Sequence, residues 1–272
     1  LCTLVDGIRR KLTIERPVKM ILDATQKITQ GDFSVRIKPF HEIGSMNEFD
    51  VISQNLNQMA SELSNVETIR TDFIANASHE LKTPIAVLKG QLENMIGEVG
   101  AYKETQKYLP RSLEVVERME KLTYEILTAA KLNTDKNLLH LQDTDISAFV
   151  NECCQDYPLL GAEKRVTIKC EIVERFYALV DKNLLKKAVS NILSNAITYS
   201  STGEIVHVRL QEEAECIKLT VANTGHMNEE YLAVAFEPFT TKEPSRNRTA
   251  GGSGLGLYIV GTILSQMGIA YE

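Results

Sequence analysis

His79, Glu80 and Thr83 have residue types and a spacing that could carry out chemistry together. At about 100° per residue in an α-helix, His79 and Thr83 share one face, and His79 projects roughly 160° away from Leu81. Apolar residues recur at intervals of three and four around Leu81, so the spacing predicts that His79 faces water. An exposed imidazole beside a carboxylate can act as a nucleophile with an orienting partner, whereas a lone histidine on a helix is ordinarily structural.

Glycines at positions 251, 252, 254 and 256 precede an apolar helical pattern from Tyr258 to Met267. Glycines ahead of a helix N-terminus let backbone N–H groups approach a phosphate, and the helix dipole favours negative charge there. A dinucleotide-binding βαβ unit would require an apolar strand directly before the glycines, but residues 240–249 are polar. The pattern therefore favours a polar lid followed by a phosphate-binding helix start.

Asn191 and Asn195 lie four residues apart, on one face of a helix predicted over residues 183–198. Their amide oxygens could ligate Mg²⁺, a hard cation that takes oxygen ligands alongside phosphates. Two amides on a mainly apolar helix could equally be buried and hydrogen-bonded, so the spacing alone leaves both interpretations open.

Two kinds of structure must position these residues. In the first half, helices are predicted over residues 17–28, 51–95 and 103–132, with a connector over 34–47 and a break at 97–100. Two amphipathic helices with a short connection form an antiparallel hairpin, which has too little core to be stable alone. We therefore expect two copies to pair as a four-helix bundle.

After Asn133 the predicted elements become shorter and mixed. Strands are predicted over residues 166–172, 176–180, 205–210 and 216–222, and helices over 147–157, 183–198 and 254–267. This mixture indicates an α/β sandwich of the α+β class, with one sheet and helices on one of its faces. The fold class is therefore multidomain, α followed by α+β.

Composition excludes some functions. The formal net charge of −6 argues against a general nucleic-acid binder, and the five scattered cysteines fit neither a zinc site nor a disulfide framework. The sequence has no stretch of ~20 apolar residues that would form a complete transmembrane helix. However, the apolar start at residues 1–5 and the basic residues over 9–19 are typical of the inner side of a membrane segment; an ordinary helix start with a basic face is the alternative.

The run Ser78–Pro84 resembles the H-box of the HisKA-type sensor histidine kinases. The resemblance implies that His79 attacks the γ-phosphate of ATP and then passes the phosphoryl group to an aspartate of a response regulator. It implies Glu80 as the acid/base partner of His79. It also implies that Thr83 helps to position the water that dephosphorylates the regulator.

Residues 181–196 are similar to the N-box of the same family, which implies Asn195 as the Mg²⁺ ligand and Asn191 at the phosphates. Asn223 stands where the family has an aspartate that accepts a bond from the adenine amino group. Its carbonyl oxygen can still accept that bond, but without charge assistance. The other residues that the resemblance places at the nucleotide are Tyr199, Gly225, Phe239, Lys242, Gly252, Gly254, Leu255 and Gly256.

Residues 16–66 look like a HAMP linker, in which two short parallel helices per protomer form a dimeric bundle. Asp50 stands where that linker usually has glycine, and an ordinary coiled-coil lead-in is the alternative. We expect residues 1–15 to end a membrane segment, 67–133 to form the dimerisation and phosphotransfer hairpin, and 140–272 to form a GHKL-type ATP-binding domain without its C-terminal hairpin. Within the family, the sequence resembles Firmicute-type kinases, including type-B vancomycin-resistance sensors.

The resemblance as a whole implies an ATP- and Mg²⁺-dependent protein-histidine kinase of a two-component system, with phosphatase activity toward its regulator. The implied partners are a second copy of the chain and a cognate response regulator. We expect the whole protein in the plasma membrane and this part of it in the cytoplasm. Two alternatives stay open: a kinase-dead module that dimerises and docks a regulator, favoured by the altered Asn223 segment, and an ATP-driven clamp, opposed by the H-box.

Overall fold

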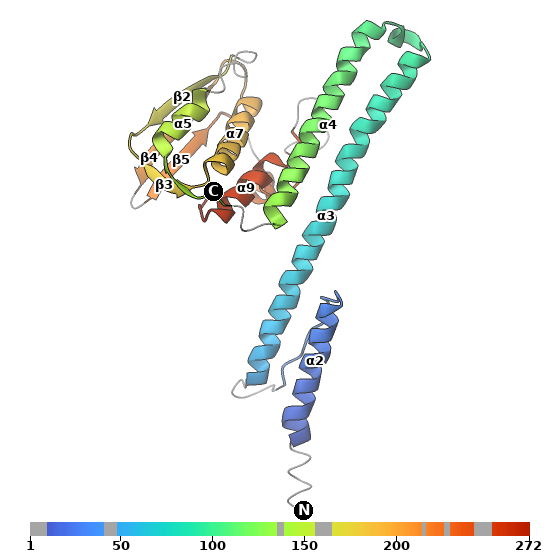
Figure 1. The fold of residues 1–272 in the computed structure, drawn as a ribbon, viewed down its shortest axis with the longest axis vertical. Coiled ribbons are helices and arrows are strands. Elements are labelled where there is room, and N and C mark those ends of the chain that lie inside the picture. Colours follow the sequence, from blue (N-terminus) through green and yellow to red (C-terminus); the bar gives the residue numbers. More distant parts are fainter. Residues whose placement is uncertain are drawn as a thin grey trace, which may run out of the picture. The chain divides into compact units, whose positions relative to one another are not determined.

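The computed structural model describes residues 10–40, 48–134, 139–155, 165–213, 216–225, 229–241 and 252–272. The chain divides into two compact units, with the boundary between Ala75 and Asn76. Figure 1 shows the ribbon with the element labels used below. No helix in the described part of the chain combines the length and the apolarity that crossing a membrane requires.

The first unit contains a short π-helical turn, η1 (Lys11–Glu15), the helix α2 (Arg16–Thr29) and the start of α3 (Glu48–Ile96). Pro17 lies in the first turn of α2, where its missing N–H costs nothing. Side chains of α3 hold the connector by hydrogen bonds. The Asn57 amide accepts from the Ile37 N–H and donates to the Ile37 carbonyl, each at 2.8 Å. Asp50, 4% exposed, accepts from the Phe40 N–H at 2.7 Å. Asp50 thus has a structural role where a glycine was expected.

The second unit begins with a helical hairpin. Helix α3 continues through Pro84 to Ile96, and a 3₁₀ turn, η2 (Gly100–Lys103), leads into α4 (Thr105–Thr134). Glu98 and Gly100 both have positive φ, which reverses the chain direction, as Figure 1 shows. The Ser112 hydroxyl donates to the Gln91 side chain at 2.9 Å and links the two helices. The predicted hairpin and its break are therefore confirmed.

The hairpin leaves an apolar stripe exposed. Its larger members are between 41% and 58% exposed, although their spacing is that of a buried helix face. These residues are Ile85, Leu92, Leu109, Leu113, Val116 and Leu127. The two helices of one chain do not cover this stripe.

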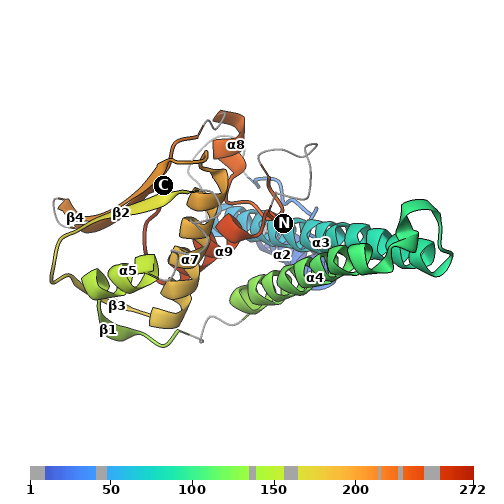
Figure 2. The same ribbon diagram turned by 90° about the horizontal axis from the view of Figure 1, so that it is seen from above.

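The rest of the second unit is an α/β domain with five described strands. Strand β2 (Thr167–Ile172) pairs in parallel with β4 (Ile205–Glu213), which pairs antiparallel with β5 (Cys216–Ala222). Helices α5 (Ile146–Gln155) and α7 (Lys182–Tyr199) share the core with this sheet (Figure 2). Val206, Val208 and Leu210 alternate along β4 and are at most 1% exposed, so the inward face of the strand is fully buried. Helix α9 (Gly256–Gln266) packs against α7.

One detail of the predicted sheet is wrong. Instead of one sheet, the described strands form two, because β1 (Gln142–Asp145) pairs antiparallel with β3 (Tyr177–Val180) and the other three strands pair separately. Strand β1 is polar and has no alternating apolar pattern, so no local pattern predicts it. The short helix α8 (Glu229–Val234) was missed as well.

Candidate functional site

His79 lies on α3 with its imidazole in solvent. The side chain is 68% exposed, and its Nδ1 is 3.8 Å from a carboxylate oxygen of Glu80, which is 35% exposed. The hydroxyl of Thr83 donates to the carbonyl of His79 at 3.3 Å, so Thr83 lies one turn further along the same face. The expected exposure of His79 is therefore observed, with a carboxylate beside it that can orient the ring or accept its proton.

Helix α7 is anchored at its start by Asp181. The Asp181 carboxylate is 4% exposed and accepts from the N–H groups of Asn183 and Leu184, both at 3.0 Å. Its second oxygen accepts from the N–H of His140 at 3.0 Å. An N-cap of this kind stabilises a helix by about 1 kcal/mol. The cap fixes the helix that carries both asparagines.

Asn191 and Asn195 meet the start of α9. The amide of Asn191 donates to the carbonyl of Gly256 at 3.4 Å. A Cβ added at Gly256 would lie 3.8 Å from Nδ2 of Asn195 and 4.0 Å from its Oδ1. The two amides therefore lie beside the glycine segment, and neither is enclosed in the core.

Gly254 has a conformation and a packing that require glycine. Its φ is +74°, and an added Cβ would lie 2.6 Å from the carbonyl carbon of Phe239 and 2.8 Å from the Thr240 nitrogen. Phe239 itself has φ of +63°. This contact places the start of the predicted lid, at Thr240, against the glycine segment. Leu255 is fully buried at the start of α9, so its side chain packs in the core and does not line the pocket.

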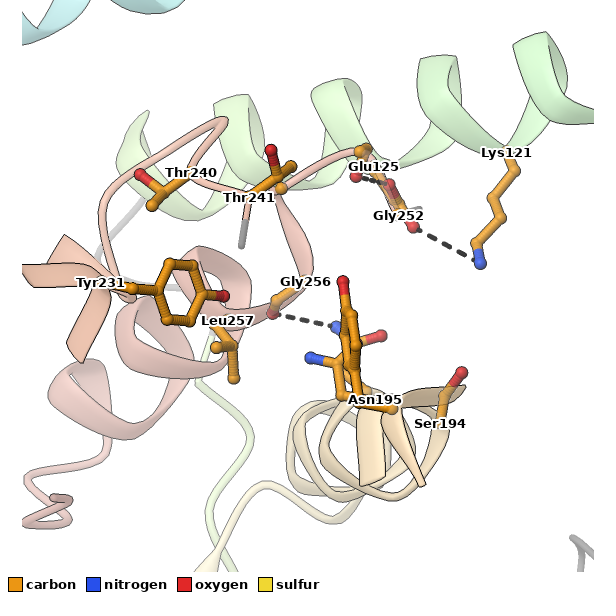
Figure 3. A pocket seen from close by; sticks show the side chains of 14 residues that line it. Lys121, Glu125, Ser194, Asn195, Tyr231, Thr240, Thr241, Gly252, Gly256 and Leu257 are labelled. Atoms are coloured by element: carbon orange, nitrogen blue, oxygen red, sulfur yellow. Dashed lines mark hydrogen bonds and ion pairs between the residues drawn. The ribbon is translucent and has the colours of Figure 1, made fainter. Parts of the chain in front are cut away.

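A pocket lies between these elements (Figure 3). It contains six of the residues that the sequence placed at a nucleotide: Asn191, Asn195, Tyr199, Gly252, Gly254 and Gly256. Tyr231, on α8, also faces it, and burial raises the pKa of the Tyr231 phenol, with a smaller contribution from Tyr199. The phenol is therefore neutral at physiological pH and can donate a hydrogen bond.

Four expected residues do not line the pocket. Asn223 and Gly225 lie next to it: a Cβ at Gly225 would be 3.6 Å from the Asn223 amide nitrogen and 3.8 Å from the carbonyl of Tyr199. Phe239 and Leu255 support the backbone around Gly254. Lys242 lies outside the described residues.

Lys121 and Glu125 also line the pocket, and both come from α4 of the hairpin. The Ser253 hydroxyl donates to the Glu125 carboxylate, and the Lys121 ammonium lies 4.0 Å from the same side chain. The sequence showed Lys121 and Glu125 only as a Lys–Glu pair four residues apart, which is common on solvated helix faces. Their role in the pocket depends on how α4 packs, which no local pattern predicts.

Helix α4 is held against the α/β domain by further contacts. The Lys187 ammonium donates hydrogen bonds to the hydroxyls of Thr128, at 2.9 Å, and Tyr124, at 3.2 Å. It also lies 4.4 Å from the centre of the Tyr124 ring. The Asn133 amide donates to the Tyr258 hydroxyl at 2.7 Å. The Gln266 amide donates to the Leu132 carbonyl. The last four turns of α4 therefore form one wall of the site.

Three parts of the chain match known domain families. Residues 14–65 match the HAMP domain, and residues 69–135 match the His Kinase A (phospho-acceptor) domain. Residues 180–271 match the histidine kinase-, DNA gyrase B-, and HSP90-like ATPase. The second match includes His79, and the third includes the pocket's asparagines and glycines.

Several curated proteins are similar over most of the chain. The signal transduction histidine-protein kinase BaeS of Escherichia coli K12 is 31% identical, over 89% of this chain and 51% of its own length. The sensor protein VanSB of Enterococcus faecalis is 34% identical, over 94% and 59%. The sensor histidine kinase CusS of Escherichia coli K12 is 31% identical, over 91% and 51%. The chain thus spans about half the length of these relatives.

Solved structures share the fold at low sequence identity. The histidine kinase AdeS of Acinetobacter baumannii aligns over 69% of this chain and 86% of its own, with a TM-score of 0.54 and 22% identity. The histidine kinase ThkA, solved in complex with the response regulator protein TrrA, aligns over 69% and 61%, with a TM-score of 0.56 and 18% identity. The order of a helical hairpin followed by an α/β domain is therefore a known architecture.

Proposed function

Since this chain belongs to the HAMP-linked sensor histidine kinases, we propose that it transfers the γ-phosphoryl group of ATP to His79 and from there to an aspartate of a response regulator. One observation carries this proposal: the exposed imidazole of His79 has a carboxylate at 3.8 Å, in a chain that also forms a glycine- and asparagine-lined pocket. A clamp driven by ATP would need the pocket but no such histidine.

The chemistry follows from the positions of these groups. An imidazole nitrogen of His79 attacks the γ-phosphorus, the bond from that phosphorus to the β,γ-bridging oxygen breaks, and ADP leaves. Glu80 orients the imidazole and accepts the proton that the attacking ring gives up. Positioning and charge neutralisation dominate such transfers, and first-turn N–H groups of α9, at Gly256 and Leu257, are placed to bind phosphate oxygens.

Mg²⁺ fits the residues around Asn195. The Asn195 amide lies beside Gly256 and supplies a hard oxygen ligand, which suits a cation that otherwise takes its ligands from phosphates and water. When bound, the ion neutralises charge on the phosphates. We assign Asn195 as its protein ligand and Asn191 as the residue that holds the start of α9 in position, through its bond to Gly256.

The assembly is proposed to be a homodimer. The exposed apolar stripe of the hairpin has the spacing of a four-helix bundle, and a second copy would bury it.

Regulator dephosphorylation is assigned to Thr83, which lies on the His79 face of α3. The basic residues over 9–19 support a plasma-membrane location for the whole protein, with this part in the cytoplasm. Residues 16–66, 67–133 and 140–272 are the proposed domains.

A kinase-dead docking module is the second candidate. It is favoured by the Asn223 segment: the Asn223 amide donates to the Thr224 carbonyl at 3.5 Å and carries no negative charge with which to bind an adenine amino group. Such a module would dimerise and bind a regulator without consuming ATP.

Incubation with γ-labelled ATP separates these functions. We expect the wild-type chain to acquire an acid-labile, alkali-stable label, and His79→Gln to acquire none. Lys82→Gln, which neutralises a neighbouring exposed residue, serves as a control and should be labelled like the wild type. A wild-type chain that binds ATP but takes up no label would support the docking module and overturn the kinase.

A further inference from the structure

Glu125 is an acidic residue in a pocket proposed to take a polyphosphate. Among the described residues that line the pocket, Lys121 and Glu125 are the only charged side chains. The Glu125 side chain is only 15% exposed, compared with 72% for Lys121. A largely buried carboxylate at this place opposes the binding of an anion unless the carboxylate moves.

The groups that Glu125 contacts are suited to binding a phosphate. The Ser253 hydroxyl accepts from the Leu255 N–H at 3.1 Å and donates its own proton to Glu125. The Lys121 ammonium lies 4.0 Å from the carboxylate. The adjacent first turn of α9 presents N–H groups without partners inside the helix, where the dipole favours negative charge. The Glu125 carboxylate thus occupies an anion-binding position.

We propose that the Glu125 carboxylate occupies the end of the pocket where the phosphates of a nucleotide bind. The terminal phosphate of a bound nucleotide must displace this carboxylate, and Lys121 then pairs with that phosphate. The proposal rests on the proposed function, because it assumes that this pocket binds ATP. The nucleotide site thereby includes two charged groups from α4 of the hairpin, the Lys121 ammonium and the competing Glu125 carboxylate.

The remaining contacts of α4 do not include another carboxylate of this kind. Those described join Lys187 to Thr128 and Tyr124, Asn133 to Tyr258, and Gln266 to the Leu132 carbonyl. They place no negative charge at the glycine segment, so an added phosphate does not repel them. Displacement of Glu125 therefore removes one of the contacts that hold α4, the bond from Ser253, and by linkage this contact weakens nucleotide binding by the same factor by which the nucleotide weakens the contact.

The test is calorimetric titration of the whole chain with AMP, ADP and the imido analogue of ATP, each with Mg²⁺. Glu125→Gln keeps a hydrogen-bond acceptor for Ser253 but removes the charge. We expect it to bind the ATP analogue about fivefold more tightly or better, the low end of ordinary coupling between sites, with a smaller gain for ADP and none for AMP. Lys121→Met should weaken binding of the analogue by a similar factor.

Glu114→Gln is the matched control. Glu114 is exposed on the same face of α4 but eleven positions earlier, about 16 Å along the helix, so its loss should leave every affinity unchanged. If Lys121 and Glu125 only stabilise the helix as a pair, both variants would shift affinity in the same direction for all three nucleotides, which overturns the inference. Wild-type affinity in Glu125→Gln overturns it too and leaves the proposed function intact. If neither the wild type nor any variant binds the analogue, the proposed function fails and the inference with it.

Discussion

Single residues decide whether the pocket keeps its shape. Gly254 combines a left-handed backbone with a contact that leaves no room for a Cβ, whereas Gly252 has no atom within 4 Å of an added Cβ and no positive φ. The two glycines look alike in the sequence, so only the structure shows that one is required for packing. The same is true of Leu255, which was expected at the nucleotide and is buried.

Gly254→Ala should therefore destabilise the second unit, while Gly252→Ala should not. A left-handed residue with a Cβ costs about 1–2 kcal/mol, and the close approach to Phe239 adds to that cost. Denaturant unfolding of the two variants and the wild type measures the difference. Equal unfolding free energies for all three would contradict the described contact between residues 239 and 254.

Thr83 should separate the two activities proposed for α3. Thr83→Ala removes a hydroxyl that donates to the His79 carbonyl and leaves the imidazole and Glu80 in place. We expect labelling of His79 within about twofold of the wild type, because one exposed hydrogen bond contributes little to stability. Dephosphorylation of a phosphorylated regulator should fall about a hundredfold or more, the low end of the contribution of a positioned catalytic group.

The control for Thr83→Ala is Thr123→Ala. Thr123, on α4, makes the same kind of bond, to the Met119 carbonyl at 2.8 Å. It should change neither rate. A Thr83→Ala variant that dephosphorylates the regulator as fast as the wild type would remove Thr83 from the proposed phosphatase mechanism.

Among the elements, those with strong apolar periodicity could be predicted from the sequence. Helices α2, α3 and α4 and strands β2, β4 and β5 agree with their predicted ranges to within a few residues, because their periodicity is local and long. Strand β1 could not be predicted, since its stability comes from β3 and from no pattern of its own. The contribution of α4 to the pocket could not be predicted either, because it depends on packing between distant segments.

The exposed stripe of the hairpin carries its own prediction. Leu113→Glu would place a charge where two copies are proposed to pack, so we expect the dimer to dissociate at micromolar concentration, as seen by sedimentation velocity. Arg111→Glu, about 160° away around the same helix, should leave the dimer intact. A Leu113→Glu chain that remains fully dimeric would show that another surface holds the copies together.

The order of the elements along the chain explains why the candidate site has two parts. The proposed nucleophile, His79, lies on α3, and the pocket lies between α7, the glycine segment and the end of α4. The helix that returns from the phospho-acceptor segment thus also closes the nucleotide pocket. In the proposed function, this arrangement would let the hairpin influence when ATP binds, as well as receive its phosphoryl group.

The central claim is that His79 receives the phosphoryl group. Its most direct test is to incubate the wild-type chain with Mg·ATP, digest it at alkaline pH, and locate the modification by tandem mass spectrometry. The account predicts a phosphoryl group on the imidazole of His79, with none on the other histidines. A phosphoryl group on a different residue, or none at all in a chain that binds the nucleotide, would contradict it.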